Sequence, residues 1–330
     1  MRIPISLLLL AALASLGACG GGSPGNSGES STLLATNQLV FDSDRTGRHE
    51  IFVMNTDGSL AQQLTHDAQY RNWWPRISPD RKKILFLRRP AAILNEGDGY
   101  AQASLWVMNA DGSEVTQLRA PGTDGWTALG HPEWSPDGTK IALFGGVGGG
   151  AEIFVTQANG RNAVQFTNRG GVNTDVSWSP DGSQLLFNGC PGTPCLPANY
   201  EIYVMNATPL SAATRLTNDG LADYDAYFSP DGRQIAWLVT VDPTRFSGAG
   251  AWAIRIADAD GGNAHDLIND GNINSKPAWS LDGQTIFFHR MALVAPFEEG
   301  KFGVFSMARD GSNLRRLTSV GNGNNEHPSN

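Results

Sequence analysis

The sequence predicts an all-β fold, a six-bladed β-propeller of four-stranded antiparallel blades that occupies residues 36–330. Three observations predict it. A turn motif, Ser-Pro-Asp-Gly, recurs along the chain; a second motif, Ile-Phe-Val-Met-Asn followed by a turn, recurs beside it; and a Leu-Thr pair ends most of the units. The units repeat at intervals of about 50 residues, a period that indicates a repeat architecture.

The first residues have the features of an export signal, which we assign to residues 1–18. A positive start is followed by an apolar run from Ile5 to Leu16, which is too short to span a bilayer. Leu16-Gly17-Ala18-Cys19 then resembles a bacterial lipobox, in which Cys19 becomes the lipidated first residue of the mature chain. The alternative is a plain secretory signal that is cut near Ala18. Residues 19–35, rich in Gly and Ser, read as a flexible tether.

The first two strands of each unit are joined by the turn motif. Proline presets the dihedral angle of a type I turn, aspartate binds its own backbone, and glycine takes the left-handed position that a hairpin needs. The aspartates are therefore expected to form turns rather than to catalyse a reaction. The aromatic residues before the turns are expected to pack between blades; they are Trp134, Trp178, Phe228 and Trp279.

The third and fourth strands follow from the other two motifs. The third strand is apolar and ends at an Asn/Asp-Gly turn, as in "IFVMNTDGS" from Ile51 and "LWVMNADGS" from Leu105. The fourth strand ends in Leu-Thr, as in "QQLT" (62–65) and "RRLT" (315–318). Four short antiparallel strands that repeat radially make a propeller blade.

The ends of the chain are complementary. "TNQLVF" (36–41) reads as a second strand with no first strand before it, and "NEHPSN" (325–330) reads as a first strand with nothing after it. We therefore expect the C-terminal strand to pair with the N-terminal strand and close the ring. Closure removes sheet edges that would otherwise invite aggregation.

Charge and cysteine content narrow the function classes. The net charge is −8 and the pI about 5.2, and no stripe of Lys and Arg is present, so nucleic acid is not an expected partner. Besides Cys19, the chain has Cys190 and Cys195 in the loop "CPGTPC", for which we predict a local disulfide in an oxidising compartment. The charged segment 42–50, "DSDRTGRHE", reads as a solvated turn.

The repeats resemble the propeller of the TolB family, whose member in the Tol system is periplasmic. The resemblance covers about residues 36–330 and rests on "WSPDG", "IYVMN" and Leu-Thr repeated together. It implies a monomeric, non-enzymatic binding module for an envelope protein, of which a peptidoglycan-associated lipoprotein is one example. Two features depart from the family: only the tether precedes the propeller, where TolB has an α/β domain, and this chain is expected to be lipid-anchored.

One face of the predicted ring carries the long loops. The connections between second and third strands are long at 88–103, 188–200, 239–250 and 289–302, whereas the other hairpin turns are short. In a four-stranded meander these connections lie on the same face of the ring. Function in repeat folds tends to sit where insertions collect, so we expect binding at this face and at the channel mouth.

The channel mouth can be assigned residue by residue. The first strand of each blade is innermost, and three residues before its aromatic or apolar end residue lies one side chain that should face the channel. These ring residues are Trp74, His131, Asp175, Asp225, Lys276 and His327. They could bind a polar ligand, with Trp73, Trp74 and Trp126 as stacking walls. They could instead form only a hydrated polar rim.

A divalent metal is a further possibility at this ring. Its candidate ligands are His131, Asp175, Asp225 and His327, because imidazole and carboxylate groups bind such ions. The corresponding alternative function is a polysaccharide lyase or hydrolase that acts at the channel mouth with metal help. No other catalytic residue is predicted. The expected location is the periplasmic side of the envelope, anchored by lipid alone, and Gly20 after the lipidated cysteine favours the outer membrane.

Overall fold

The computed structural model describes residues 33–93, 96–191, 195–196, 199–241, 251–293, 301–319 and 321–330. Ser31–Asn330 forms one compact unit. Its described part contains twenty-four strands, the helix α1 (Glu96–Ala101) and the 3-10 turn η1 (Thr123–Gly125). The predicted signal peptide, Cys19 and nearly all of the tether lie outside the described residues. No helix in the described part is long and apolar enough to cross a membrane.

Two of the four sheets contain four strands each. The first has the order β24 (Asn325–Ser329), β1 (Gln38–Ser43), β2 (Glu50–Asn55) and β3 (Gln62–Gln63). The second has the order β4 (Tyr70–Ile77), β5 (Lys83–Pro90), β6 (Ser104–Asn109) and β7 (Thr116–Arg119). All neighbours in these two sheets are antiparallel.

Each of the other two sheets contains two four-stranded meanders. One has β8 (Leu129–Trp134), β9 (Lys140–Val147), β10 (Gly150–Gln157) and β11 (Val164–Gln165), then β12 (Val172–Trp178), β13 (Gln184–Cys190), β14 (Glu201–Asn206) and β15 (Ala213–Arg215). The other has β16 (Asp223–Phe228), β17 (Gln234–Thr240), β18 (Trp252–Asp258) and β19 (His265–Ile268), then β20 (Ile273–Trp279), β21 (Thr285–Met291), β22 (Gly303–Ala308) and β23 (Arg315–Arg316). In each of these sheets the two meanders join at one parallel pair, which is Ala151 with Val172 in the first and Trp252 with Ile273 in the second.

The turn motif forms the hairpins that the sequence predicts. In the turn between β8 and β9, the hydroxyl of Ser135 donates to Asp137 at 2.6 Å, and the backbone N–H of Gly138 donates to the Ser135 carbonyl at 2.8 Å. Gly138 has φ 69°, which a glycine adopts without steric cost. The same serine-to-aspartate bond is made at Ser78, Ser179, Ser229 and Ser280.

The two ends of the described chain lie side by side in the first sheet. β24 is antiparallel to β1, with Val40 opposite Ser329 and Asp42 opposite Glu326. The side chain of Asn330 continues the contact by donating to the Gln38 carbonyl at 2.6 Å. The strand pairing expected between the termini is therefore present.

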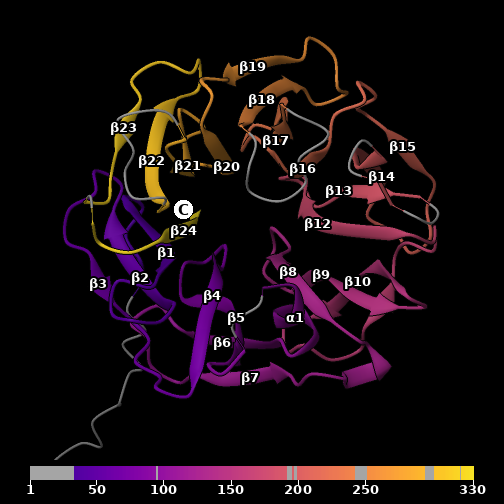
Figure 1. The fold of residues 1–330 in the computed structure, drawn as a ribbon. Helices are drawn as coiled ribbons and strands as arrows, with labels where there is room; N and C mark the ends of the chain where they lie inside the picture. Colours follow the sequence, from indigo (N-terminus) through magenta and orange to yellow (C-terminus); the bar gives the residue numbers. More distant parts are fainter. Residues whose placement is uncertain are drawn as a thin grey trace, which may run out of the picture. The chain divides into compact units, whose positions relative to one another are not determined.

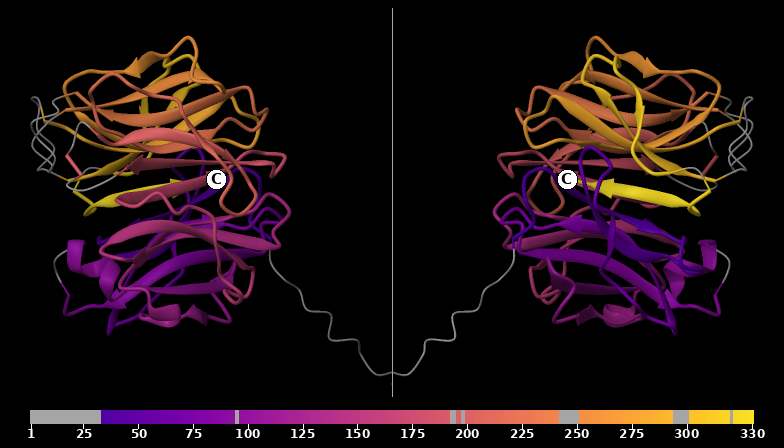
Figure 2. Two further views of the ribbon diagram at one scale, coloured as in Figure 1. Left: turned by 90° about the vertical axis from the view of Figure 1, so that its right-hand side faces the viewer. Right: turned by 90° about the vertical axis from the view of Figure 1, so that its left-hand side faces the viewer.

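The sheets are arranged around a common centre, and the first strand of each meander lies nearest to it (Figure 1). These inner strands contact one another in sequence: β4 with β8, β8 with β12, β12 with β16, β16 with β20, β20 with β24, and β24 with β4. Seen from the sides, α1 lies on one face of the arrangement (Figure 2). The inner strands thus surround the site described below.

The core lies between neighbouring sheets. Ile84 and Phe86 of the second sheet pack with Val40 and Ile51 of the first in one buried cluster. Trp134, at the end of β8, packs against the second sheet and donates from Nε1 to the Arg76 carbonyl at 3.3 Å. The expectation that such aromatic residues fill the space between units is confirmed for Trp134, where burying the ring removes a large apolar surface from water.

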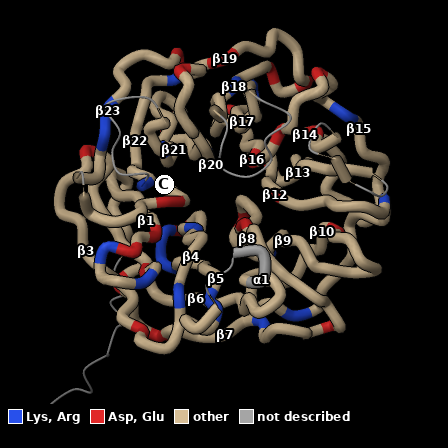
Figure 3. The backbone as a smooth tube through the Cα atoms, viewed as in Figure 1, with Lys and Arg blue, Asp and Glu red and all other residues tan. Residues whose placement is uncertain are grey.

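Lys and Arg do not gather in one stripe. They alternate with Asp and Glu around the described chain (Figure 3). This distribution agrees with the sequence, in which no stripe of Lys and Arg is present.

The predicted disulfide is not formed in the structure. Cys190 ends β13 with its side chain fully buried, and the Cys195 thiol donates to the Cys190 carbonyl oxygen at 3.1 Å instead of bonding to its sulfur. Burial and the neighbouring thiol raise the pKa of Cys190 to about 12. The disulfide predicted from the Cys-x4-Cys spacing is therefore not found in this structure, although the two thiols are neighbours.

Candidate functional site

All six predicted ring residues occupy the same irregular position in their strands. Each inner strand has a register shift at this point, and each ring residue has a positive φ between 48° and 59°; the six are Trp74, His131, Asp175, Asp225, Lys276 and His327. This left-handed conformation is uncommon for residues with side chains and costs about 1–3 kcal/mol at each position. Such bulges redirect a side chain.

The residue that follows the bulge explains part of this geometry. Proline follows four of the ring residues, at Pro75, Pro132, Pro277 and Pro328. Proline has no N–H and cannot donate to a sheet, so it favours a break in the ladder there. The local sequence thus helps to end regular pairing where the ring residue turns inward.

Trp74 lies at the centre of the ring residues. Its ring is parallel to the imidazole of His131, with centroids 4.0 Å apart, and lies 4.6 Å from that of His327. The Nζ atom of Lys276 lies 3.2 Å from the Trp74 ring centroid. Trp74 is only 4% exposed. The structure therefore brings together four ring residues from four different strands through one indole.

The remaining contacts are polar pairs. The Nδ1 atom of His131 contacts Oδ1 of Asp175, and its Nε2 atom lies 2.7 Å from the hydroxyl of Tyr100 in α1. The ammonium of Lys276 donates to Asp225 at 2.7 Å. All six predicted residues are thus linked by contacts in one place.

Burial sets the protonation of two ring residues. Burial lowers the pKa of His131 well below its ordinary value, and the charges of Lys276, His327 and Arg76 lower it further, so the imidazole is neutral at pH 7. Burial also lowers the pKa of Lys276 to about 7, although the carboxylate of Asp225 opposes this shift.

Asp42 is a functional candidate that the sequence analysis missed. It belongs to β1, is fully buried, and accepts hydrogen bonds from Nδ1 of His327 at 2.7 Å, Nδ1 of His49 at 2.9 Å and the backbone N–H of Trp74 at 3.2 Å. Burial opposes its ionisation, but the two histidines hold its pKa well below the usual range. The reading of 42–50 as a wholly solvated turn is therefore wrong at its start. The sequence signal for its burial was that Asp42 continues the predicted strand 36–41 and lies opposite Ile51, an apolar residue of the next strand.

A pocket of about 660 Å³, which we call the cup, opens beside the ring residues. Four of the ring residues line it: Trp74, His131, Asp175 and Asp225. Most other lining groups are aromatic or small; they are Tyr100, Phe144, Gly149, Gly150, Ala151, Val172, Thr174, Tyr200, Tyr224, Leu238, Thr240, Trp252 and Ser275. A volume of this size is typical of ligand pockets.

The cup lies at the connections between second and third strands. Tyr100, Gly149, Tyr200 and Trp252 come from four such connections or from their ends, yet they line the same pocket. The predicted gathering of these loops on one face is therefore supported where they are described. Residues 242–250 and 294–300, which belong to two of the predicted long loops, lie outside the described residues.

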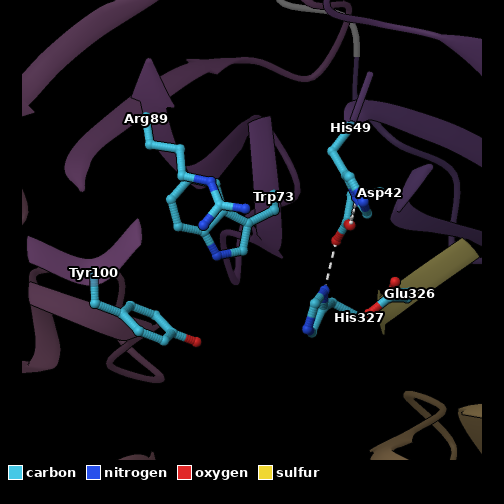
Figure 4. A pocket seen from close by; sticks show the side chains of 7 residues that line it. All are labelled: Asp42, His49, Trp73, Arg89, Tyr100, Glu326 and His327. Atoms are coloured by element: carbon cyan, nitrogen blue, oxygen red, sulfur yellow. Dashed lines mark hydrogen bonds and ion pairs between the residues drawn. The ribbon is translucent and has the colours of Figure 1, made fainter. Parts of the chain in front are cut away.

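A smaller side pocket of about 70 Å³ adjoins the ring at His327 (Figure 4). It is lined by Asp42, His49, Trp73, Arg89, Tyr100, Glu326 and His327. Figure 4 shows the imidazole of His327 below Asp42, with Tyr100 across the space. Of the three predicted stacking walls, Trp73 lies in this pocket and Trp74 in the cup. Trp126 does not: it is buried in the core, 4.4 Å from the Phe154 ring, so its prediction is wrong.

A third pocket, of about 230 Å³, is lined by the ends of the inner strands. Arg76, Glu133, Tyr227 and Lys276 are among its residues, and Arg76 donates to Glu133 at 2.8 Å. Trp74 lines the cup and Lys276 lines this third pocket, so the contact between them lies where the two pockets approach each other.

The four metal candidates do not form one ligand set. His131 contacts Asp175, His327 bonds to Asp42, and Asp225 bonds to Lys276. Within the described ranges, no group of three or more His, Cys, Asp or Glu side chains is placed to hold a metal ion. The arrangement instead offers aromatic surfaces and carboxylates, which suit binding.

Sequence comparison finds partial relatives, and no family model matches the chain. Over 232 residues it is 30% identical to tricorn protease homolog 1 of Streptomyces coelicolor, covering 67% of this chain and 20% of that protein. Over 149 residues it is 25% identical to a TolB homolog of Chlorobium luteolum, covering 45% of this chain and 30% of that protein. The chain thus spans less than a third of the length of either relative.

Structural comparison extends the likeness to most of the chain. TolB from Acinetobacter baumannii superposes with a TM-score of 0.69 at 20% identity, covering 89% of this chain and 66% of that one. At this level of identity the likeness concerns the fold. It agrees with the resemblance carried by the repeated motifs.

Proposed function

We propose that this chain, which folds as a TolB-like β-propeller, is a non-enzymatic binding module of the bacterial envelope that holds a segment of a protein partner in the cup. The observation that carries the proposal is the cup itself. Aromatic and carboxylate side chains from separate sheets converge there, and they are fixed by strand bulges that the fold repeats at an energetic cost. Costly, repeated backbone strain of this kind is typical of binding sites.

We further propose six blades that close into a ring. The repeated motifs, the meanders of the four sheets, the contacts of each inner strand with the next and the pairing of β24 with β1 support this arrangement. A closed ring would hold the ring residues at fixed positions without help from a ligand, which lowers the entropic cost of binding.

The location and the partner follow from the sequence and from the likeness to TolB. We propose that residues 1–18 direct export, that Cys19 carries lipid, that residues 19–35 form a tether, and that residues 36–330 stand as a monomer on the periplasmic side, with the outer membrane favoured. An envelope protein, such as a peptidoglycan-associated lipoprotein, is the proposed partner class.

A site-specific crosslinking experiment tests the proposal. A photo-crosslinking amino acid is placed at Val172, which lines the cup, and for comparison at Leu60, which is 80% exposed and lies outside it. Irradiation of intact cells should give a protein adduct at Val172 that is missing at Leu60. If Val172 gives no adduct, or if both positions give the same adducts, a partner does not bind in the cup.

A further inference from the structure

The charge of the cup is one-sided. Its described lining includes the carboxylates of Asp175 and Asp225 but no Lys or Arg. Asp225 has a cationic neighbour in Lys276. Among the described residues, Asp175 has no Lys or Arg partner: it contacts His131 and, with the side-chain amide of Asn188 turned over, accepts from that amide.

The two groups that hold Asp175 are neutral. An amide carries no charge, and His131 is kept neutral by burial and by the cations around it. Asp175 is only 5% exposed, so water screens its charge poorly. A buried carboxylate without a cationic neighbour favours a positive group brought by a ligand.

The walls of the cup suit the same kind of ligand. The rings of Tyr200 and Tyr224 lie 5.1 Å apart, and Trp252 lines the cup with them. The Nε1 atom of Trp252 has no hydrogen-bond partner among the described residues. Aromatic faces attract cations electrostatically, and they do so more strongly when the cation is removed from water.

The protein already uses this arrangement once. The ammonium of Lys276 lies 3.2 Å from the Trp74 ring centroid and bonds to Asp225 at 2.7 Å. A cation held between an indole and a carboxylate is therefore compatible with this part of the fold. Trp74 and Asp225 both line the cup as well.

We propose that the cup recognises a cationic side chain, arginine or lysine, of its protein partner, with Asp175 supplying the charge and the aromatic walls the contact surface. This rests on the proposed function and adds the chemistry of the partner. The net charge of −8 would also attract a basic segment at long range. A guanidinium group is favoured over an ammonium because it is planar and stacks on aromatic rings.

The test compares two peptides that differ in charge alone. Acetyl-Gly-Gly-Arg-Gly-Gly-amide and its analogue with citrulline, which is nearly isosteric and neutral, are titrated into the full chain. Binding is measured by saturation-transfer NMR, which detects weak complexes. The arginine peptide should bind at least about tenfold more tightly, and a glutamate peptide should not compete. Equal binding of the two peptides, tighter binding of the glutamate peptide, or no binding of the arginine peptide overturns the proposal.

Variants assign the effect to the cup. D175N should reduce the preference for arginine over citrulline to about twofold or less, whereas E114Q, at an exposed carboxylate outside the cup, should leave it unchanged. W252L, which removes a wall of the cup but no charge, should weaken the binding of both peptides. It is the second variant to rely on if D175N proves unstable in a thermal melt. Unchanged arginine binding in both D175N and W252L would exclude the cup as the site.

The outcome separates this inference from the proposed function. If Val172 crosslinks to a partner in cells but arginine gives no advantage over citrulline, the binding role stands and the charge preference fails. If Val172 gives no adduct, the binding role fails whatever the peptides do.

Discussion

Asp42 shows how one buried residue can set the charge of the histidines beside it. It is fully buried and holds His49 and His327, which lie on different strands or turns. Burial opposes protonation of His49, but the hydrogen bond and charge of Asp42 outweigh this effect and raise its pKa to about 9. This histidine therefore remains charged at neutral pH.

Replacing His49 should change how stability depends on pH. A raised folded-state pKa stabilises the fold fully below the unfolded value of about 6.5, and the gain is lost as the pH rises through about 9. Urea unfolding should therefore show that the free energy of unfolding of the wild type, relative to that of H49Q, falls by on the order of 2 kcal/mol between pH 6.5 and 9.

Lys276 changes the stability of the fold in the opposite direction over an overlapping pH range. Its pKa is lowered, so its contribution to stability rises between about pH 7 and 10.5. The contribution of His49 is therefore obtained only from the difference between the unfolding free energies of the wild type and H49Q at each pH. Two parallel pH profiles would show that His49 does not titrate as the structure indicates.

At the scale of the strand, the threonine that ends a unit, in Leu-Thr or in Phe166-Thr167, ties the outer edge of the unit to its third strand. The threonine hydroxyl accepts from a backbone N–H of that strand, as Thr167 does from Ile153 at 2.8 Å. The same hydroxyl donates to Glu152 at 2.6 Å. Equivalent acceptor bonds are made by Thr65, Thr217 and Thr318.

T167V should lower the free energy of unfolding by about 2 kcal/mol, because it keeps the shape of the side chain but leaves a buried N–H and part of a buried carboxylate without a partner. Urea denaturation measures the change. T116V, at an exposed threonine of β7, is the matched control and should change stability by less than about 0.5 kcal/mol. Equal effects of the two substitutions would show that the buried threonine bonds add nothing.

At the scale of the whole molecule, β24 completes the first sheet. Without it, the backbone groups of β1 that now pair with Asn325–Ser329 would form an open edge. The inner strands β20 and β4 would also lose the neighbour that lies between them.

Removal of residues 325–330 should therefore cause self-association and a lower, broader thermal transition. Size-exclusion chromatography and a thermal melt measure these changes. A chain with the same six positions replaced by Gly and Ser should behave like the truncated one. A truncated chain that stays monomeric, with an unchanged transition, would show that the terminal pairing is dispensable.

The proposed lipid anchor is also a property of the whole chain. C19S should move the protein from the membrane fraction to the soluble fraction of lysed cells, because a serine cannot carry the lipid. C195S is the control, since this cysteine lies in the loop after β13. It should leave the distribution of the protein between the membrane and soluble fractions unchanged. A wild type that is already soluble would contradict the anchor.

The sequence by itself determined the repeat, the turns and the place of the ring residues. Turn geometry depends on neighbouring residues such as Ser135, Asp137 and Gly138, so it can be read locally. The repeat then fixes one register in every inner strand, which is why Trp74 and His131 could both be assigned to the channel without a structure.

Only the tertiary structure decided which of these side chains meet, and how. Asp42 and His327 come from opposite ends of the chain, and no local pattern links them. The burial of Trp126 and the contact of Lys276 with Trp74 likewise depend on packing between strands that are distant in sequence. Long-range packing, which sequence periodicity does not encode, sets the charge and the shape of the cup.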